Sequence, residues 1–80
     1  MFTVYILHSE KDNNRYIGVT SDLSRRITEH NRGMVKSTKN RRPLKLVYIE
    51  NYMDKTEALK REKFFKSGKG REYLNNLEII

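Results

Sequence analysis

Cysteine is absent from the 80 residues of this chain. The chain can therefore form neither a disulfide nor a thiolate zinc site, and its small core must close unaided or with a partner. This absence fits a reducing compartment.

Long apolar runs are also missing, since the longest lies near residues 4–7 and is too short to cross a bilayer. Residues 1–20 show no signal-peptide pattern. We expect one cytoplasmic domain over residues 1–80, with no membrane partner.

Acidic residues are scarce, with 10 Asp and Glu against 17 Lys and Arg, so the formal net charge is +7. The excess is concentrated between residues 25 and 45, where Glu29 is the lone acid. The basic residues of that segment are Arg25, Arg26, Arg32, Lys36, Lys39, Arg41, Arg42 and Lys45. A one-sided field attracts polyanions and speeds encounter with them. A surface that serves solubility alone has no need to segregate its charges, so this pattern favours a nucleic-acid partner.

The pattern of apolar and turn residues predicts three strands and three helices. Phe2–Leu7 is rich in aromatic and β-branched residues and apolar on both faces, as a central strand would be. The strands are expected over about 2–7, 15–19 and 44–49, and the helices over about 23–32, 55–66 and 72–77. Asp22 and Gly33 are the expected cap and stop of the first helix, and Gly68 and Gly70 are expected to break the second. The order β-β-α-β-α-α predicts an α/β (α+β) fold with a three-stranded, mostly antiparallel sheet flanked by helices.

Glu62 is unusual because it falls among the apolar residues of the helix predicted over 55–66. Ala58, Leu59 and Phe65 form that apolar face. A carboxylate directed at a core is costly unless it is paired or binds a cation. A partner such as Arg26, or a position at the edge of the core, would satisfy it. The alternative is a metal ligand, because magnesium commonly uses one or two carboxylates together with water and substrate phosphate.

Two tyrosines flank the first hairpin. Tyr5 lies in the first strand and Tyr16 in the second, with Gly18 on the same face as Tyr16 and expected to leave open space beside it. A phenol has a pKa near 10, so it is a poor base at neutral pH unless neighbouring cations lower that value. It can also orient a water molecule without ionising. Strand packing with a solvated hydroxyl is the alternative for both, and Tyr48 is expected in the core.

Arg26 and His30 are four residues apart on the first predicted helix and so project from neighbouring positions. Leu23, Ile27 and His30 form a stripe, and Arg26 borders it. An arginine can make a bidentate contact with phosphate, and a histidine can bind a phosphate oxygen or move a proton. A solvated arginine and a hydrogen-bonded histidine at the rim of the core are the alternatives. With no cysteine and no paired histidines, a zinc site is not expected.

In this order, these segments resemble the GIY-YIG nuclease domain, over residue 2 to about residue 70. The matching segments are Val4-Tyr5-Ile6-Leu7, Tyr16-Ile17-Gly18-Val19-Thr20, Asp22-Leu23, Arg25-Arg26, Glu29-His30-Asn31 and Ala58-Leu59-Lys60-Arg61-Glu62. The small stand-alone branch of the family is matched further by Thr38, Arg42-Pro43 and Leu46-Val47-Tyr48.

The resemblance implies a role for each matched position. Tyr5 and Tyr16 correspond to the two signature tyrosines, one of which serves as general base or water-orienting group. Arg26 corresponds to the arginine that stabilises charge on the phosphate, and His30 to an assisting histidine of some branches. Glu62 corresponds to the single glutamate that binds the metal, Mg²⁺ or Mn²⁺.

Two positions depart from the family pattern. Thr3 stands where the signature has glycine. Val19 stands where some members carry a lysine that could acidify a tyrosine. Without that lysine, Arg25, Arg26 or the metal would have to lower the pKa of the tyrosine.

The function implied is metal-dependent hydrolysis of DNA phosphodiester bonds, structure-selective or weakly sequence-selective, in repair or recombination. DNA, including branched DNA, is the expected substrate, and a repair protein is a possible second partner. The residues expected to hold the DNA backbone are Arg25, Lys36, Lys39, Arg41, Arg42 and Lys45. Three alternatives stay open: a non-catalytic nucleic-acid-binding module, a latent subunit of a repair complex, and a small ribosome-associated basic protein, which would leave Glu62 unexplained.

Overall fold

The structure of the protein is a computed structural model that describes residues 1–78. Three strands and three α-helices follow one another in the order β-β-α-β-α-α, as the sequence predicts. They are β1 (Phe2–Ser9), β2 (Arg15–Thr20), α1 (Leu23–Asn31), β3 (Leu44–Tyr52), α2 (Lys55–Phe65) and α3 (Gly68–Asn76), with a short 3₁₀ helix η1 (Lys39–Arg41) before β3.

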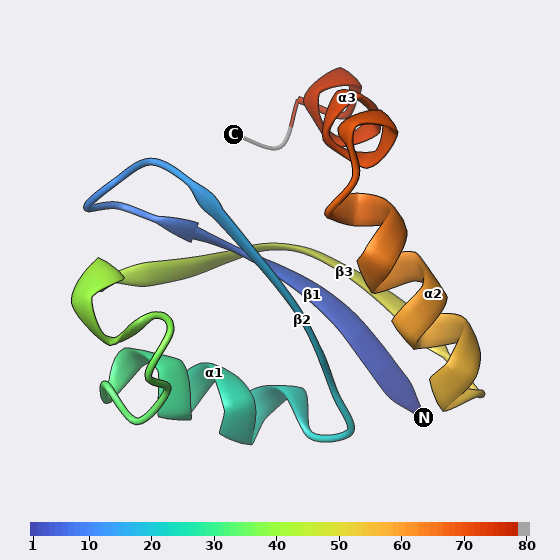
Figure 1. Cartoon of the computed structure of the whole chain (residues 1–80). Coiled ribbons are helices and arrows are strands. Elements are labelled where there is room, and N and C mark those ends of the chain that lie inside the picture. The colour runs from blue at the N-terminus through green and yellow to red at the C-terminus, as the bar shows by residue number, and fades with distance from the viewer. Residues whose placement is uncertain (79–80) are drawn as a thin grey trace.

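The three strands form one antiparallel sheet in the order β2-β1-β3. The apolar first strand is therefore central, as predicted, and β2 and β3 are the edges. Successive side chains of a strand point to opposite faces, so Val4 and Ile6 lie on one face while Tyr5 and Leu7 lie on the other. Figure 1 shows α1 on one side of the sheet, and α2 leading into α3 on the other.

The face covered by α2 and α3 holds the larger core. Val4 and Ile6 pack there against Ala58, Phe65 and Leu74, all five fully buried. Leu59 was predicted on the apolar face of α2, and that was wrong, because 44% of Leu59 is exposed.

The opposite face is covered by α1. Tyr5 and Leu7 pack there with Leu44, and the partly buried side chains against this cluster are Tyr16, Leu23 and Ile27. The predicted caps of α1 are confirmed. The Asp22 carboxylate accepts a hydrogen bond from the Arg25 backbone N–H at 3.2 Å, and Gly33 just beyond the helix has the left-handed φ of +78°. These caps fix the ends of α1, and the helix directs Leu23, Ile27 and His30 toward the sheet.

The last helix begins earlier than predicted. Ser67 caps α3 by accepting a hydrogen bond from the Gly70 backbone N–H at 3.1 Å, so Gly68 and Gly70 lie in its first turn. A Cβ added to Gly70 would lie 1.8 Å from the Phe64 carbonyl oxygen. Gly70 is therefore needed for the close approach of α3 to the end of α2. The sequence prediction that Gly68 and Gly70 only break the second helix was incomplete, because both belong to the first turn of α3.

Glu50, in the part of β3 that extends beyond the predicted strand, anchors α2 to the sheet. Its carboxylate accepts hydrogen bonds from Arg61 on α2 at 2.8 and 3.2 Å, and from the hydroxyls of Tyr48 and Tyr52 at 2.5 and 2.7 Å. Tyr48 packs against the core of this face, as expected.

None of the helices within residues 1–78 is long and apolar enough to span a membrane.

Candidate functional site

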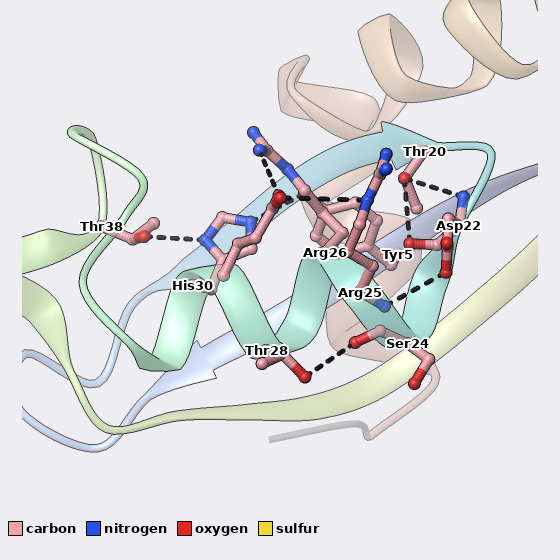
Figure 2. Close-up of polar contacts among 10 residues, drawn as sticks. Tyr5, Thr20, Asp22, Ser24, Arg25, Arg26, Thr28, His30 and Thr38 are labelled. Carbon is pink, nitrogen blue, oxygen red and sulfur yellow. Dashed lines mark hydrogen bonds and ion pairs between the residues drawn. The ribbon is translucent and has the colours of Figure 1, made fainter.

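A buried chain of hydrogen bonds connects β1, α1 and the loop before η1. The Tyr5 hydroxyl lies 2.8 Å from His30 Nε2, and His30 Nδ1 lies 2.7 Å from the Thr38 hydroxyl. Exposure of each of the three residues is 1% or less. Figure 2 shows Thr38 reaching His30 from the loop. Both imidazole nitrogens therefore have a partner, and the tautomer decides which of them donates.

Tyr16 joins this cluster from β2. Its ring centroid lies 5.0 Å from that of His30 and 6.3 Å from that of Tyr5. In the antiparallel register Tyr5 lies opposite Gly18, and a Cβ on Gly18 would lie 2.5 Å from the Tyr5 hydroxyl oxygen. The space that we expected beside Tyr16 is filled by the Tyr5 ring. Gly18 thus lets the two phenols and the imidazole pack together.

Burial keeps His30 and Tyr5 uncharged. It lowers the pKa of His30 to about 4, with a further contribution from the positive charge of Arg26. Burial also raises the pKa of the Tyr5 hydroxyl, although the Arg26 guanidinium opposes that rise. Negative charge at Tyr16 and Glu62 would raise the pKa of Tyr5 further. At neutral pH, Tyr5 is consequently a protonated phenol next to a neutral imidazole.

Arg26 lies between this cluster and Glu29. Its Nη1 lies 3.1 Å from Glu29 Oε1, and Arg25 Nε lies 3.9 Å from the other oxygen of the same carboxylate. Figure 2 shows both arginines projecting from α1. The neighbouring Tyr5 hydroxyl contributes most to raising the pKa of Arg26. Arg26 therefore stays charged beside Tyr5.

Glu62 comes from α2. Its side chain is 22% exposed, and Lys66 Nζ lies 3.3 Å from its Oε2. The partner considered from the sequence, Arg26, pairs with Glu29 instead. Glu62 is nevertheless close enough to influence Tyr5, because its charge is among the causes that raise the pKa of that phenol. Four of the sequence-predicted residues thus form one cluster, and the fifth lies in its electrostatic range.

The oxygen ligands at this site fit a weakly held divalent cation. Residues 1–78 contain no group of three His, Cys, Asp or Glu side chains that could enclose a metal. Glu62 offers one partly exposed carboxylate, which suits Mg²⁺ when water and a substrate phosphate complete the coordination. Lys66 shows that this carboxylate already attracts a cation.

The six residues predicted to hold DNA differ in their availability. Arg41 is engaged, with its Nε 2.7 Å from Asp12 Oδ2, and Arg42 Nε donates to the Lys39 carbonyl at 2.9 Å. The exposed members of the set are Arg25, Lys36, Lys39, Arg42 and Lys45. Lys39 and Arg42 also line a cavity of about 560 Å³ with Lys11.

Thr38 is the site residue whose role sequence reasoning missed. It was noted as part of the family pattern, but nothing in the sequence indicates that it would bond to His30, eight residues earlier. The contact depends on how the loop folds back over α1. Glu29 was likewise noted as the lone acid of the basic segment and as part of the family pattern, but its pairing with Arg26 was not predicted.

Comparison with known proteins agrees with this arrangement. The model of the family described as the GIY-YIG catalytic domain matches residues 1–75. The chain belongs to the GIY-YIG family. Among curated proteins, UPF0213 protein SH2523 of Staphylococcus haemolyticus is 42% identical over 76 residues, covering 94% of this chain and 92% of that protein. UPF0213 protein YazA of Bacillus subtilis is 46% identical over 57 residues. The matched region covers 70% of this chain and 58% of YazA.

A solved structure supports the same assignment. The solution NMR structure of the UPF0213 protein BH0048 from Bacillus halodurans matches with a TM-score of 0.59 and 37% identity, over 96% of this chain and 85% of that one. The relatives are small stand-alone GIY-YIG proteins whose names state no activity. A GIY-YIG catalytic domain implies nuclease activity on DNA, and such nucleases generally use divalent metal ions.

Proposed function

We propose that this GIY-YIG domain is a metal-dependent DNA endonuclease that hydrolyses phosphodiester bonds with structural or weak sequence selectivity, in repair or recombination. The observation that carries the proposal is the packing of Tyr5, Tyr16 and His30 into one cluster beside Arg26. A phosphodiester needs a cation for its negative charge and a group that positions water, and this cluster offers both.

The two tyrosines differ in what they can do. The Tyr5 hydroxyl is buried and bonded to His30, so it serves as a fixed donor or acceptor within the site. Tyr16 is only partly buried and lines a cavity of about 730 Å³, so its hydroxyl can reach water. We assign the orientation of the attacking water to Tyr16. His30, neutral at pH 7, fixes the Tyr5 hydroxyl next to it.

Arg26 and Glu62 supply the charges. Arg26 stabilises the negative charge that builds on the phosphate oxygens during attack. Glu62 would hold the divalent cation, which when bound supplies positive charge to the phosphate and the departing oxygen. Lys66 would give up its contact with the Glu62 carboxylate to a divalent cation held there.

Selectivity is proposed to come from DNA shape. Lys36, Lys39 and Lys45 are exposed, and lysine contacts with phosphates carry affinity and little sequence information. A partner in a repair complex would supply further selection of branched DNA.

The decisive experiment compares Glu62→Ala with Glu57→Ala on linear, flap and junction DNA in Mg²⁺ and in Mn²⁺. Both acids lie on α2, but Glu57 is exposed and only pairs with Lys60 at 3.7 Å. We expect Glu62→Ala to lose cleavage by about 100-fold or more while keeping salt-sensitive DNA binding, and Glu57→Ala to retain cleavage. A wild-type protein that binds these DNAs and never cuts them would instead be a non-catalytic module.

A further inference from the structure

A cavity of about 730 Å³ lies at the free edge of the sheet, between the start of β2 and the last helix α3. Its lining includes Arg15, Tyr16, Ile17, Lys66 and Arg71. Tyr16 and Ile17 are neighbours in β2 and point to opposite faces, so the cavity extends around the strand edge. This volume falls in the range of small-molecule sites and exceeds what one phosphate group would fill.

The lining is strongly positive. Arg15, Lys66 and Arg71 contribute three cations, and none of the described lining residues is acidic. Within residues 1–78, no hydrogen bond or ion pair engages the guanidinium of Arg71. Surfaces of this kind attract anions, and arginine binds phosphate oxygens through its fixed N–H geometry.

Arg15 carries an unsatisfied donor in this cavity. Its Nη2 donates to Asn75 Oδ1 at 2.9 Å, but its buried Nε has no hydrogen-bond partner within the described residues. A buried donor without an acceptor is costly and uncommon in folded proteins. The guanidinium of Arg15 is thus incompletely paired within the fold, and a phosphate oxygen is a well-suited acceptor for the N–H groups of such an arginine at a cavity wall.

The cavity adjoins the proposed catalytic groups on two sides. Tyr16 is part of its wall, with a ring centroid 5.0 Å from that of His30. On the other side, Lys66 is part of the wall and lies 3.3 Å from the Glu62 carboxylate. A nucleic-acid strand seated in the cavity would therefore bring its next phosphate to Tyr16 and Glu62.

We propose that this cavity binds the nucleotide of the DNA strand that adjoins the scissile phosphate. Arg15 and Arg71 hold its phosphate, and the partly buried side chain of Ile17 supports the sugar and base. The proposal rests on the proposed nuclease function and adds a binding site on α3 and the edge of β2, away from the basic segment at residues 25–45.

The test is a titration of ¹⁵N-labelled wild-type protein in EDTA with a single-stranded thymidine oligonucleotide of about ten residues. We expect the side-chain Nε–H signals of Arg15 and Arg71 to shift, together with backbone amides near residues 14–17 and 71–75. Arg71→Gln should weaken binding by about 3- to 10-fold and lower the salt dependence by about 0.7 in the log–log slope, as the loss of one phosphate contact predicts. Lys69→Gln is the matched control, because Lys69 is an exposed cation of the same helix outside the cavity.

Shifts confined to the segment at residues 36–45, an absence of shifts, or equal effects of Arg71→Gln and Lys69→Gln would each overturn the proposal. Failure of the nuclease function looks different, since the cavity signals would shift while no DNA is cut in Mg²⁺ or Mn²⁺. Conversely, cleavage that depends on Glu62 with unmoved cavity signals would refute only the cavity.

Discussion

At the scale of single residues, His30 couples the site to the stability of the fold. Its imidazole is fully buried between Tyr5 and Thr38, with Arg26, Glu29 and the Tyr16 ring also nearby. Burial, helped by Arg26, lowers its pKa from 6.5 to about 4. Between these values an unfolded chain binds a proton that the folded chain does not, so acidification through this window favours unfolding.

We predict that the free energy of unfolding falls by up to about 3 kcal/mol as the pH is lowered from 6.5 to 4, through His30. Arg41 lowers the pKa of Asp12 to about 2. Burial acts to raise the pKa of Glu50, but hydrogen bonds from Arg61, Tyr48 and Tyr52 lower it overall. Protonation of these two carboxylates reduces the free energy of unfolding further at lower pH. Urea unfolding at several pH values measures this dependence. His30→Gln should flatten it, whereas His8→Gln at the end of β1 should not. Equal slopes in the wild type and His30→Gln would refute the assignment.

The two tyrosines are distinguished by their hydroxyls. Tyr16→Phe should lower cleavage by about 100-fold with little change in stability, because its hydroxyl is assigned to the attacking water. Tyr5→Phe should lower cleavage less, and should cost about 1–3 kcal/mol of stability because His30 Nε2 loses its buried partner. Single-turnover cleavage and urea unfolding of both variants measure these effects. The opposite ranking in cleavage would exchange the two roles.

Much of the site could be predicted at this scale because the relevant spacing is local. Arg26 and His30 are one helical turn apart, and the hairpin brings Tyr5 close to Tyr16. Contacts that depend on loop conformation or on helix termini gave no such signal. Thr38 reaches His30 from a loop, and Arg15 reaches Asn75 across 60 residues of sequence.

At the scale of elements, the junction between α2 and α3 depends on one glycine. A Cβ on Gly70 would collide with the Phe64 carbonyl, whereas around Gly68 there is open space within 4 Å. The sequence analysis treated both glycines as helix breakers because glycine disfavours helix interiors. The sequence gives no sign that the first turn of α3 requires glycine at position 70 because its backbone packs closely against Phe64.

We predict that Gly70→Ala destabilises the protein by more than about 2 kcal/mol, because the helix must move to admit the methyl group. Gly68→Ala should be neutral or stabilising by up to about 1 kcal/mol, since alanine is the better helix former. Thermal unfolding of the two variants makes a matched comparison. Similar melting temperatures for both would contradict the close contact at Gly70.

β3 shows a second limit of sequence reasoning. The alternation that predicted this strand stops being clear after Ile49, yet the strand continues to Tyr52. Glu50 explains the extension, because its carboxylate joins β3 to Arg61 on α2. The Arg61 guanidinium also stacks on the rings of Phe64, Phe65 and Tyr73 at 4.6–4.9 Å. A glutamate in a strand gives no indication of such a partner on the following helix.

At the scale of the whole molecule, the proposed site depends on both faces of the sheet. Tyr5, Tyr16 and His30 lie on the face covered by α1, while Glu62 belongs to α2 on the opposite side. β2 is the edge strand between them, and the large cavity extends around that edge. The order of elements and the apolar central strand were predictable from periodicity. The meeting of the two faces at β2 was implied only by family likeness.

In the proposed function, the Glu62 carboxylate, the two phenols and Arg26 share one cation and phosphate site. Titration of the ¹⁵N-labelled protein with Mn²⁺ tests it directly, because a paramagnetic ion broadens the signals of nearby nuclei. We predict selective broadening at residues 5, 16, 26 and 62, which Glu62→Gln abolishes and Glu57→Gln leaves unchanged. Broadening centred on Asp12 or Asp54 instead, unaffected by Glu62→Gln, would contradict the claim.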